Sequence, residues 1–147
     1  MEVIKKFLNR DYVNKQLLKQ MTHISPPIGN EISCIMHGVK EEFFKDNALL
    51  KSVFLKALSR DKFNILDISE KAFDPKGYTI MALLSESHAT IHTFPEHNSL
   101  VFHIYTCRGE NDGRKTFAFL KQSLKPISMD FFERPVVVNK EIKEEIS

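Results

Sequence analysis

The sequence lacks tryptophan and has only two cysteines, Cys34 and Cys107, among its 147 residues. Without Trp, aromatic core and stacking positions must be filled by Tyr or by one of the twelve Phe. The cysteines could pair, but the N-terminus has no continuous apolar signal core, so a cytoplasmic protein with free thiols is the simpler expectation. No stretch is long and apolar enough to span a bilayer, which argues against a membrane partner.

The chain also carries little net charge. The net charge is +2, and 42% of the residues are hydrophobic and 27% charged. These are globular values, and so small a positive excess does not indicate a nucleic-acid partner. The length suits one domain with a substantial core, and we find no internal repeat or low-complexity linker.

Apolar periodicity predicts alternating helices and strands. An amphipathic N-terminal helical extension occupies residues 1–28, with its helices over 2–21. We expect strands at 31–37, 63–68, 78–84, 85–95 and 100–106, helices at 40–58 and 112–124, and a charged, fraying tail at 140–147. The apolar segments 129–132 and 136–138 would add an edge strand or dock on a neighbour. This order favours an α+β fold, a two-layer α/β sandwich with a mainly antiparallel sheet.

Residues 84–96 concentrate polar side chains between apolar segments. Ser85 and Glu86 read as a tight connection, after which the side chains alternate between two faces. One face would carry His88, Thr90 and His92, and the other, which includes Ala89 and Ile91, would pack on the core.

These residues alone leave two kinds of chemistry open. Ser87 could be a nucleophile and His92 its base, although hydrolytic triads are assembled in space and not by local spacing. A metal site built from histidines is a weaker option because no CxxC or HExxH motif accompanies them. The histidines concerned are His88, His92, His97 and His103.

The complete pattern is more specific than its parts. It comprises Glu86-Ser87-His88-x-Thr90-Ile91-His92-Thr93-x-Pro95-Glu96, with Phe73-x-Pro75-x-Gly77 before it and Tyr105-Thr106-Cys107 after it. This pattern resembles the short prokaryotic S-adenosylmethionine decarboxylases, a pyruvoyl-dependent family.

The resemblance implies that the chain makes its own cofactor. Ser87 would attack the carbonyl of Glu86, and elimination from the resulting ester would divide the chain into residues 1–86 and 87–147. The new terminus at Ser87 would become a pyruvoyl group, so that neither an external cofactor nor a metal is needed. Its ketone would accept the electrons left by carbon dioxide, as pyridoxal phosphate does elsewhere.

Other matching positions imply further roles. His92 would remove the α-proton during elimination, which suits a neutral imidazole. Thr79 stands where many relatives have a processing serine. Cys107 would protonate the decarboxylated carbon, although viewed alone it would read as a small buried residue at a strand end.

The resemblance implies S-adenosylmethionine as the substrate and polyamine (spermidine) synthesis as the pathway. Phe73 and Phe94 would stack on adenine, and Glu96 would bind the ribose hydroxyls. The alternative is that the two Phe belong to the core and that Glu96 is a turn residue. A homodimer of processed protomers, packed sheet to sheet, is also implied.

Some positions depart from the family pattern. Relatives usually have an acidic residue in the strand before the cysteine and Cys-Gly at its end, where this chain has His103 and Cys107-Arg108. Some relatives decarboxylate L-ornithine or L-arginine, and Arg108 or Arg114 could then hold the substrate carboxylate. A non-catalytic regulatory paralogue is a further alternative, although it would not need Glu86, Ser87, His92 and Cys107 together.

Overall fold

A computed structural model of the chain describes residues 25–139. Its strands are β1 (Ile28–His37), β2 (Ile65–Ala72), β3 (Tyr78–Leu84), β4 (Ser87–Phe94), β5 (Ser99–Thr106) and β6 (Ser128–Val137). Its helices are α2 (Glu42–Lys45), α3 (Asn47–Arg60) and α4 (Arg114–Leu124), with a short 3₁₀ turn, η1 (Pro95–His97). The predicted helices over 2–21 and the tail over 140–147 lie outside the described residues.

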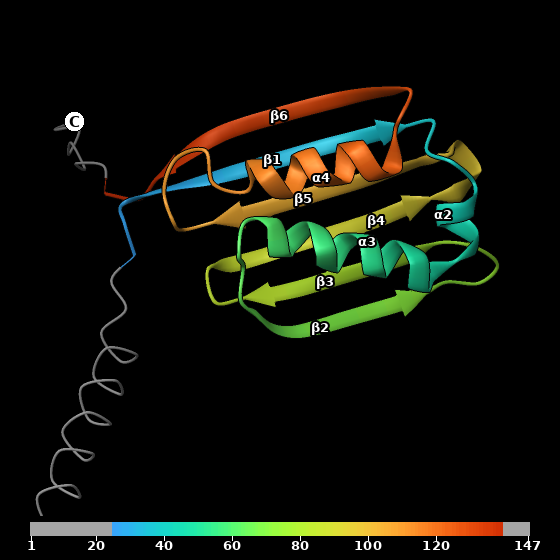
Figure 1. Cartoon of the computed structure of the whole chain (residues 1–147), viewed down its shortest axis with the longest axis horizontal. Coiled ribbons are helices and arrows are strands. Elements are labelled where there is room, and N and C mark those ends of the chain that lie inside the picture. The colour runs from blue at the N-terminus through green and yellow to red at the C-terminus, as the bar shows by residue number, and fades with distance from the viewer. Residues whose placement is uncertain (1–24, 140–147) are drawn as a thin grey trace, which may run out of the picture.

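The strands form one six-stranded sheet in the order β2-β3-β4-β5-β1-β6, and every neighbouring pair is antiparallel. Helices α3 and α4 lie side by side across one face of this sheet (Figure 1). The predicted α+β sandwich with an antiparallel sheet is therefore confirmed.

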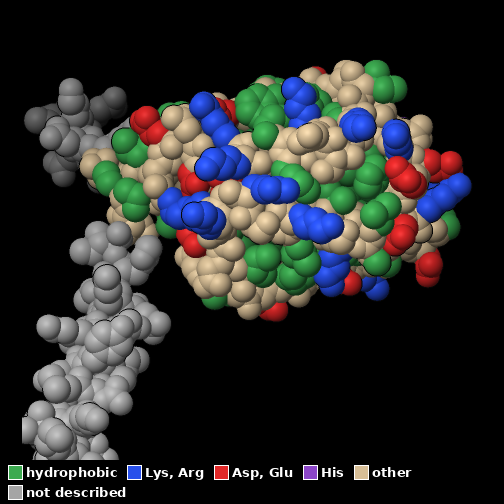
Figure 2. Space-filling model, in the orientation of Figure 1, with side chains coloured by type: hydrophobic (Ala, Val, Ile, Leu, Met, Phe, Trp, Pro, Cys, Tyr) green, Lys and Arg blue, Asp and Glu red, His purple; other side chains and the backbone are tan. Residues whose placement is uncertain are grey.

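The core lies between the sheet and the two helices. Alternate residues of each central strand point into it, as the period of two requires. Its largest fully buried side chains include Phe54 and Leu58 of α3, Leu120 and Leu124 of α4, and Ile91, Phe102 and Ile104 of the sheet. The outer face of the helices carries scattered Lys and Arg side chains (Figure 2).

The opposite face of the sheet has no second layer within the described part of the chain. It exposes apolar side chains that a covered sheet would bury: Met81 is 47% exposed, Leu83 55% and Phe132 65%. We call this surface the open face. As predicted, His88, Thr90 and His92 lie on the side opposite the buried Ala89 and Ile91.

One predicted element was wrong in detail. The predicted single helix over 40–58 is broken at Asp46. The extended backbone of Asp46 ends α2, and the Asp46 carboxylate caps α3 by accepting a hydrogen bond from the Leu49 N–H. The predicted edge strand is confirmed, because segments 129–132 and 136–138 contribute to one strand, β6, which runs through Pro135 at the edge of the sheet. Proline is tolerated there because β6 lies at the sheet edge, where one side of the backbone needs no hydrogen-bonded partner.

Candidate active site

The turn between β3 and β4 holds the predicted cleavage position. Ser85 and Glu86 alone connect Leu84 to Ser87, and these two flanking residues pair across the hairpin. Ser87 has a backbone φ of +149°, in a region that residues other than Gly rarely occupy. Such a conformation costs on the order of 1–3 kcal/mol and persists only where its surroundings hold it. The peptide bond between Glu86 and Ser87 is therefore followed by a strained residue.

The carbonyl that precedes Ser87 has a defined hydrogen-bond donor. The backbone N–H of Cys107 donates to the oxygen of Glu86 over 3.0 Å. This donor lies directly after β5, whose last residue, Thr106, pairs with Ser87. A backbone N–H aimed at a carbonyl polarises it and can stabilise the negative charge that an attack on its carbon would develop.

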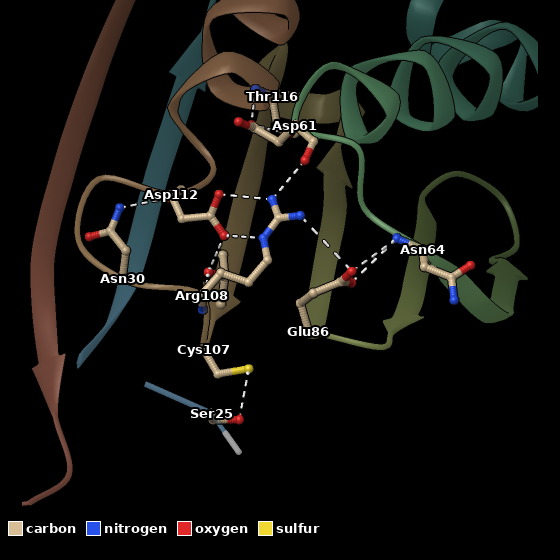
Figure 3. A network of polar contacts seen from close by, with 10 residues as sticks. Ser25, Asn30, Asp61, Asn64, Glu86, Cys107, Arg108, Asp112 and Thr116 are labelled. Atoms are coloured by element: carbon tan, nitrogen blue, oxygen red, sulfur yellow. Dashed lines mark hydrogen bonds and ion pairs between the residues drawn. The ribbon is translucent and has the colours of Figure 1, made fainter. Parts of the chain in front are cut away.

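The Cys107 thiol is free and partly exposed beside this turn. The hydroxyl of Ser25 donates a hydrogen bond to its sulfur over 3.5 Å (Figure 3). The Ser87 hydroxyl lies 3.3 Å from Nδ1 of the neighbouring His88. One end of the β4–β5 pair thus brings together three of the predicted residues, Glu86, Ser87 and Cys107.

The other two predicted processing residues form a separate pair. The hydroxyl of Thr79 and Nδ1 of His92 are 2.9 Å apart, and the two residues are direct partners across β3 and β4. His92 follows Ser87 by five residues on one strand, which places their backbones roughly 16 Å apart at a rise of about 3.3 Å per residue. The imidazole of His92 is therefore not brought to Ser87 within one chain.

The predicted substrate-binding residues share the end of the sheet that holds Thr79 and His92. Phe73 adjoins β2, Phe94 ends β4, and Glu96 lies in η1. Phe73 is 50% exposed and Phe94 41%, so neither ring belongs to the core. The site residues thus form two clusters, which we call the cleavage cluster (Glu86, Ser87 and Cys107) and the ring cluster (Thr79, His92, Phe73, Phe94 and Glu96).

Charged and aromatic groups occupy the open face beside the cleavage cluster. His103 lies 2.9 Å from one carboxylate oxygen of Glu31, and the other oxygen accepts a hydrogen bond from Arg134 over 2.7 Å. The His88 ring stands 5.7 Å from the His103 ring and 6.0 Å from the Tyr105 ring. Burial, followed by the charge of His103, lowers the pKa of His88 from its ordinary value. Within residues 25–139, no group of three or more His, Cys, Asp or Glu could hold a metal ion.

The two arginines proposed for a small substrate are engaged with internal carboxylates. Arg108 donates to both oxygens of Asp112 over 2.8 Å and to the backbone oxygen of Asp61 over 2.7 Å. Arg114 pairs with Glu133 on β6. Neither guanidinium is therefore free to hold the carboxylate of an amino acid without giving up these contacts.

Sequence reasoning missed the network around Arg108. It joins Asp112, Thr106 and the loop after α3 to the cleavage turn (Figure 3). The spacing between Arg108 and Asp112 could have suggested a local ion pair. The partners in the loop after α3 and in the cleavage turn lie 22 to 47 positions from the residues they contact, so no local signal could have revealed them.

Comparison with known proteins gives consistent results. A family model described as S-adenosylmethionine decarboxylase matches residues 31–135. An S-adenosylmethionine decarboxylase proenzyme of Pyrobaculum neutrophilum is 31% identical over 71% of this chain and 86% of its own length. An arginine decarboxylase proenzyme of Hyperthermus butylicus is 33% identical over 67% of this chain and 71% of its own length. The crystal structure of the adenosylmethionine decarboxylase from Aquifex aeolicus VF5 shares the fold, with a TM-score of 0.69 and 22% identity over 84% of this chain and 99% of that chain.

Proposed function

Because the chain belongs to the S-adenosylmethionine decarboxylase family, we propose that it is a self-processing, pyruvoyl-dependent enzyme that releases carbon dioxide from S-adenosylmethionine. The product, decarboxylated S-adenosylmethionine, would serve polyamine synthesis. The free Cys34 and Cys107 thiols fit the reducing cytoplasm, where we expect the enzyme to act.

The observation that carries this proposal is the hydrogen bond from the Cys107 N–H to the Glu86 oxygen beside the strained Ser87. In the proposed cleavage, the Ser87 hydroxyl oxygen attacks the Glu86 carbonyl carbon. The charge that develops on the Glu86 oxygen is stabilised by the Cys107 N–H. The peptide C–N bond between Glu86 and Ser87 then breaks. An ester now joins the Glu86 carbonyl carbon to the Ser87 side-chain oxygen, and the backbone nitrogen of Ser87 becomes a free amino group.

Elimination completes the separation of the fragments. A base removes the α-proton of Ser87, and the C–O bond to the ester breaks, so that Glu86 leaves as a carboxylate. Addition of water and loss of ammonia convert the remaining dehydroalanine into a pyruvoyl group. Once formed, this group supplies an electron sink for decarboxylation. The position suits it, because Ser87 begins its strand and the partly exposed Cys107 thiol, the proposed proton donor, lies directly after the adjacent strand β5.

The distance between the two clusters leads us to propose a homodimer as the active form. His92 is the proposed base, yet roughly 16 Å of β4 separates it from Ser87 of the same chain. Two open faces packed around a two-fold axis near the middle of β4 would set the ring cluster of one copy against the cleavage cluster of the other. This packing would also bury the exposed Met81 and Leu83, which are otherwise costly on a free surface.

S-adenosylmethionine is favoured as the substrate by the ring cluster. Two exposed aromatic rings, Phe73 and Phe94, offer stacking surface for the wide adenine ring, whereas ornithine has no planar group and arginine has only its small guanidinium. The similarity to an arginine decarboxylase proenzyme favours arginine as the second candidate. Carbon dioxide release from S-adenosylmethionine, arginine and ornithine tests this choice directly. Turnover of arginine or ornithine alone would contradict the assignment.

A further inference from the structure

Glu86 is restrained at both ends, and the restraint on its side chain involves a group with no assigned role. Its backbone oxygen accepts the hydrogen bond from Cys107. Its carboxylate accepts from the backbone N–H of Asn64 over 3.3 and 3.4 Å and lies 4.0 Å from Nη1 of Arg108 (Figure 3). The same loop holds the preceding residue, because the Asn64 amide donates to the Ser85 hydroxyl over 2.8 Å and the Ser85 N–H donates to the Asn64 oxygen over 2.9 Å.

Arg108 is held rigidly enough to act on Glu86. Its guanidinium makes a two-point contact with Asp112, donates to the Asp61 backbone and lies 4.2 Å from the centre of the Phe63 ring. The Asp112 carboxylate also accepts from the Thr106 hydroxyl over 2.5 Å. Asp61 in turn accepts two hydrogen bonds of 2.7 Å from Thr116, so that both helices are tied to the same centre.

The charge of Arg108 matters because of what happens at Glu86 during cleavage. An attack on its carbonyl carbon places negative charge on the oxygen of a residue whose own carboxylate is already negative. Only 15% of that side chain is exposed, so water screens the repulsion incompletely. A guanidinium 4.0 Å away offsets the carboxylate and restrains it.

We infer that Arg108 is a positioning residue for self-cleavage, which restrains Glu86 and offsets part of the charge of its carboxylate while Ser87 attacks. This inference rests on the proposed function. Arg108 has no part in the later reaction, because its contacts go to Glu86, Asp112, Asp61 and Phe63 and not to the cysteine thiol. The role therefore belongs to the formation of the enzyme and not to its turnover.

The test compares Arg108→Gln, Arg108→Lys and the unsubstituted chain in two measurements. The first is the rate at which freshly synthesised chain divides into residues 1–86 and 87–147. The second is carbon dioxide release per cleaved chain. We expect Arg108→Gln to slow cleavage by about ten-fold or more, since it removes a charge from a poorly screened position. We expect Arg108→Lys to cleave at a rate between those of Arg108→Gln and the unsubstituted chain, because lysine keeps the charge but loses the two-point contact with Asp112. Release per cleaved chain should stay unchanged.

Arg60→Gln is the matched control. The Arg60 guanidinium also stacks on a phenylalanine, 4.6 Å from the centre of the Phe119 ring, but on the outer face of the helices. The Arg60→Gln substitution should leave the cleavage rate unaltered. Stability is compared by denaturant unfolding of each substitution combined with Ser87→Ala, which prevents cleavage.

Two results would overturn the inference. One is cleavage at the unsubstituted rate in folded Arg108→Gln or Arg108→Lys. The other is an equal loss of cleavage rate and of release per cleaved chain, which would indicate a general structural defect. If the unsubstituted chain itself never cleaves, the proposed function fails together with this inference, whereas cleavage that is indifferent to Arg108 overturns the inference alone.

Discussion

Cys107 contributes two different groups to the proposed site, and they can be separated. Its backbone N–H contacts the Glu86 oxygen, while its thiol is the proposed proton donor. Cys107→Ala keeps the first group and removes the second. We therefore expect complete cleavage with carbon dioxide release reduced by about 10² or more, the usual contribution of a positioned acid. Intact mass and a release assay measure the two effects, and normal release would contradict the acid assignment.

His92 is expected to act at a later step than Ser87. If it removes the α-proton, His92→Ala should stop at the ester, which has the mass of the uncleaved chain but is cut by hydroxylamine. His97→Ala is the matched control, because it removes an exposed imidazole from η1, near His92 in the chain but with no proposed part in the cleavage. A His92→Ala chain that divides at the normal rate would contradict this role.

Residue patterns predicted which side chains matter but not which of them meet. Ser87, His92 and Cys107 were chosen from one motif, and the antiparallel register assigns them to two ends of the same strands. Glu86 and Cys107 are neighbours only because β4 pairs with β5. The contacts of Arg108 with Asp61 and Glu86 depend on tertiary packing and had no signature in the sequence.

At the scale of elements, the break between α2 and α3 depends on one side chain. The Asp46 carboxylate accepts the Leu49 N–H over 3.0 Å and satisfies a donor at the start of α3. Asp46→Ala should lower the free energy of unfolding by about 1 kcal/mol, the usual cost of losing such a cap. Denaturant unfolding in the Ser87→Ala background checks this.

Glu110→Ala serves as the comparison for Asp46→Ala, because it removes an exposed carboxylate from a loop. Equal effects of the two substitutions would show that Asp46 acts by charge alone and not as a cap.

The strand over 78–84 was predicted better than the helix over 40–58. Segment 78–84 matches β3 in full, because it is a short, largely apolar run bounded by turns that carry Pro75 and Gly77 on one side and Ser85 and Glu86 on the other. The helix over 40–58 hid its break, since apolar residues continue at helical spacing across Asp46 and only the extended backbone of that residue reveals the interruption. Segments 129–132 and 136–138 both contribute to β6, because an edge strand tolerates Pro135 between them.

At the scale of the whole molecule, stability should fall at acidic pH. Burial alone would raise the pKa of Asp112, but hydrogen bonds from Arg108 and Thr106 outweigh it and hold that pKa below its ordinary value. A hydrogen bond from His103 chiefly lowers the pKa of Glu31. A carboxylate with a lowered folded pKa stabilises the fold above its unfolded pKa, near 4, and this stability is lost as the pH falls through the folded value.

His88 adds to this dependence at higher pH. Its folded pKa lies below the unfolded value of about 6.5, so that below this pH the unfolded chain takes up a proton that the folded chain refuses. We expect the unfolding free energy of the Ser87→Ala chain to decline from pH 7 to pH 5 and more steeply below pH 4. Denaturant unfolding at fixed protein concentration measures it. Adding His88→Gln should reduce the decline of the unfolding free energy between pH 7 and pH 5. An unchanged slope over that pH range would contradict the contribution of His88.

The central claim is that this chain cuts itself between Glu86 and Ser87, and intact mass of freshly purified protein under denaturing conditions tests it most directly. The account predicts two fragments, residues 1–86 and 87–147, the second blocked at its amino end by a pyruvoyl group, while Ser87→Ala remains whole. A single unsubstituted chain that stays uncut on long incubation would contradict the account and favour a non-catalytic member of the family.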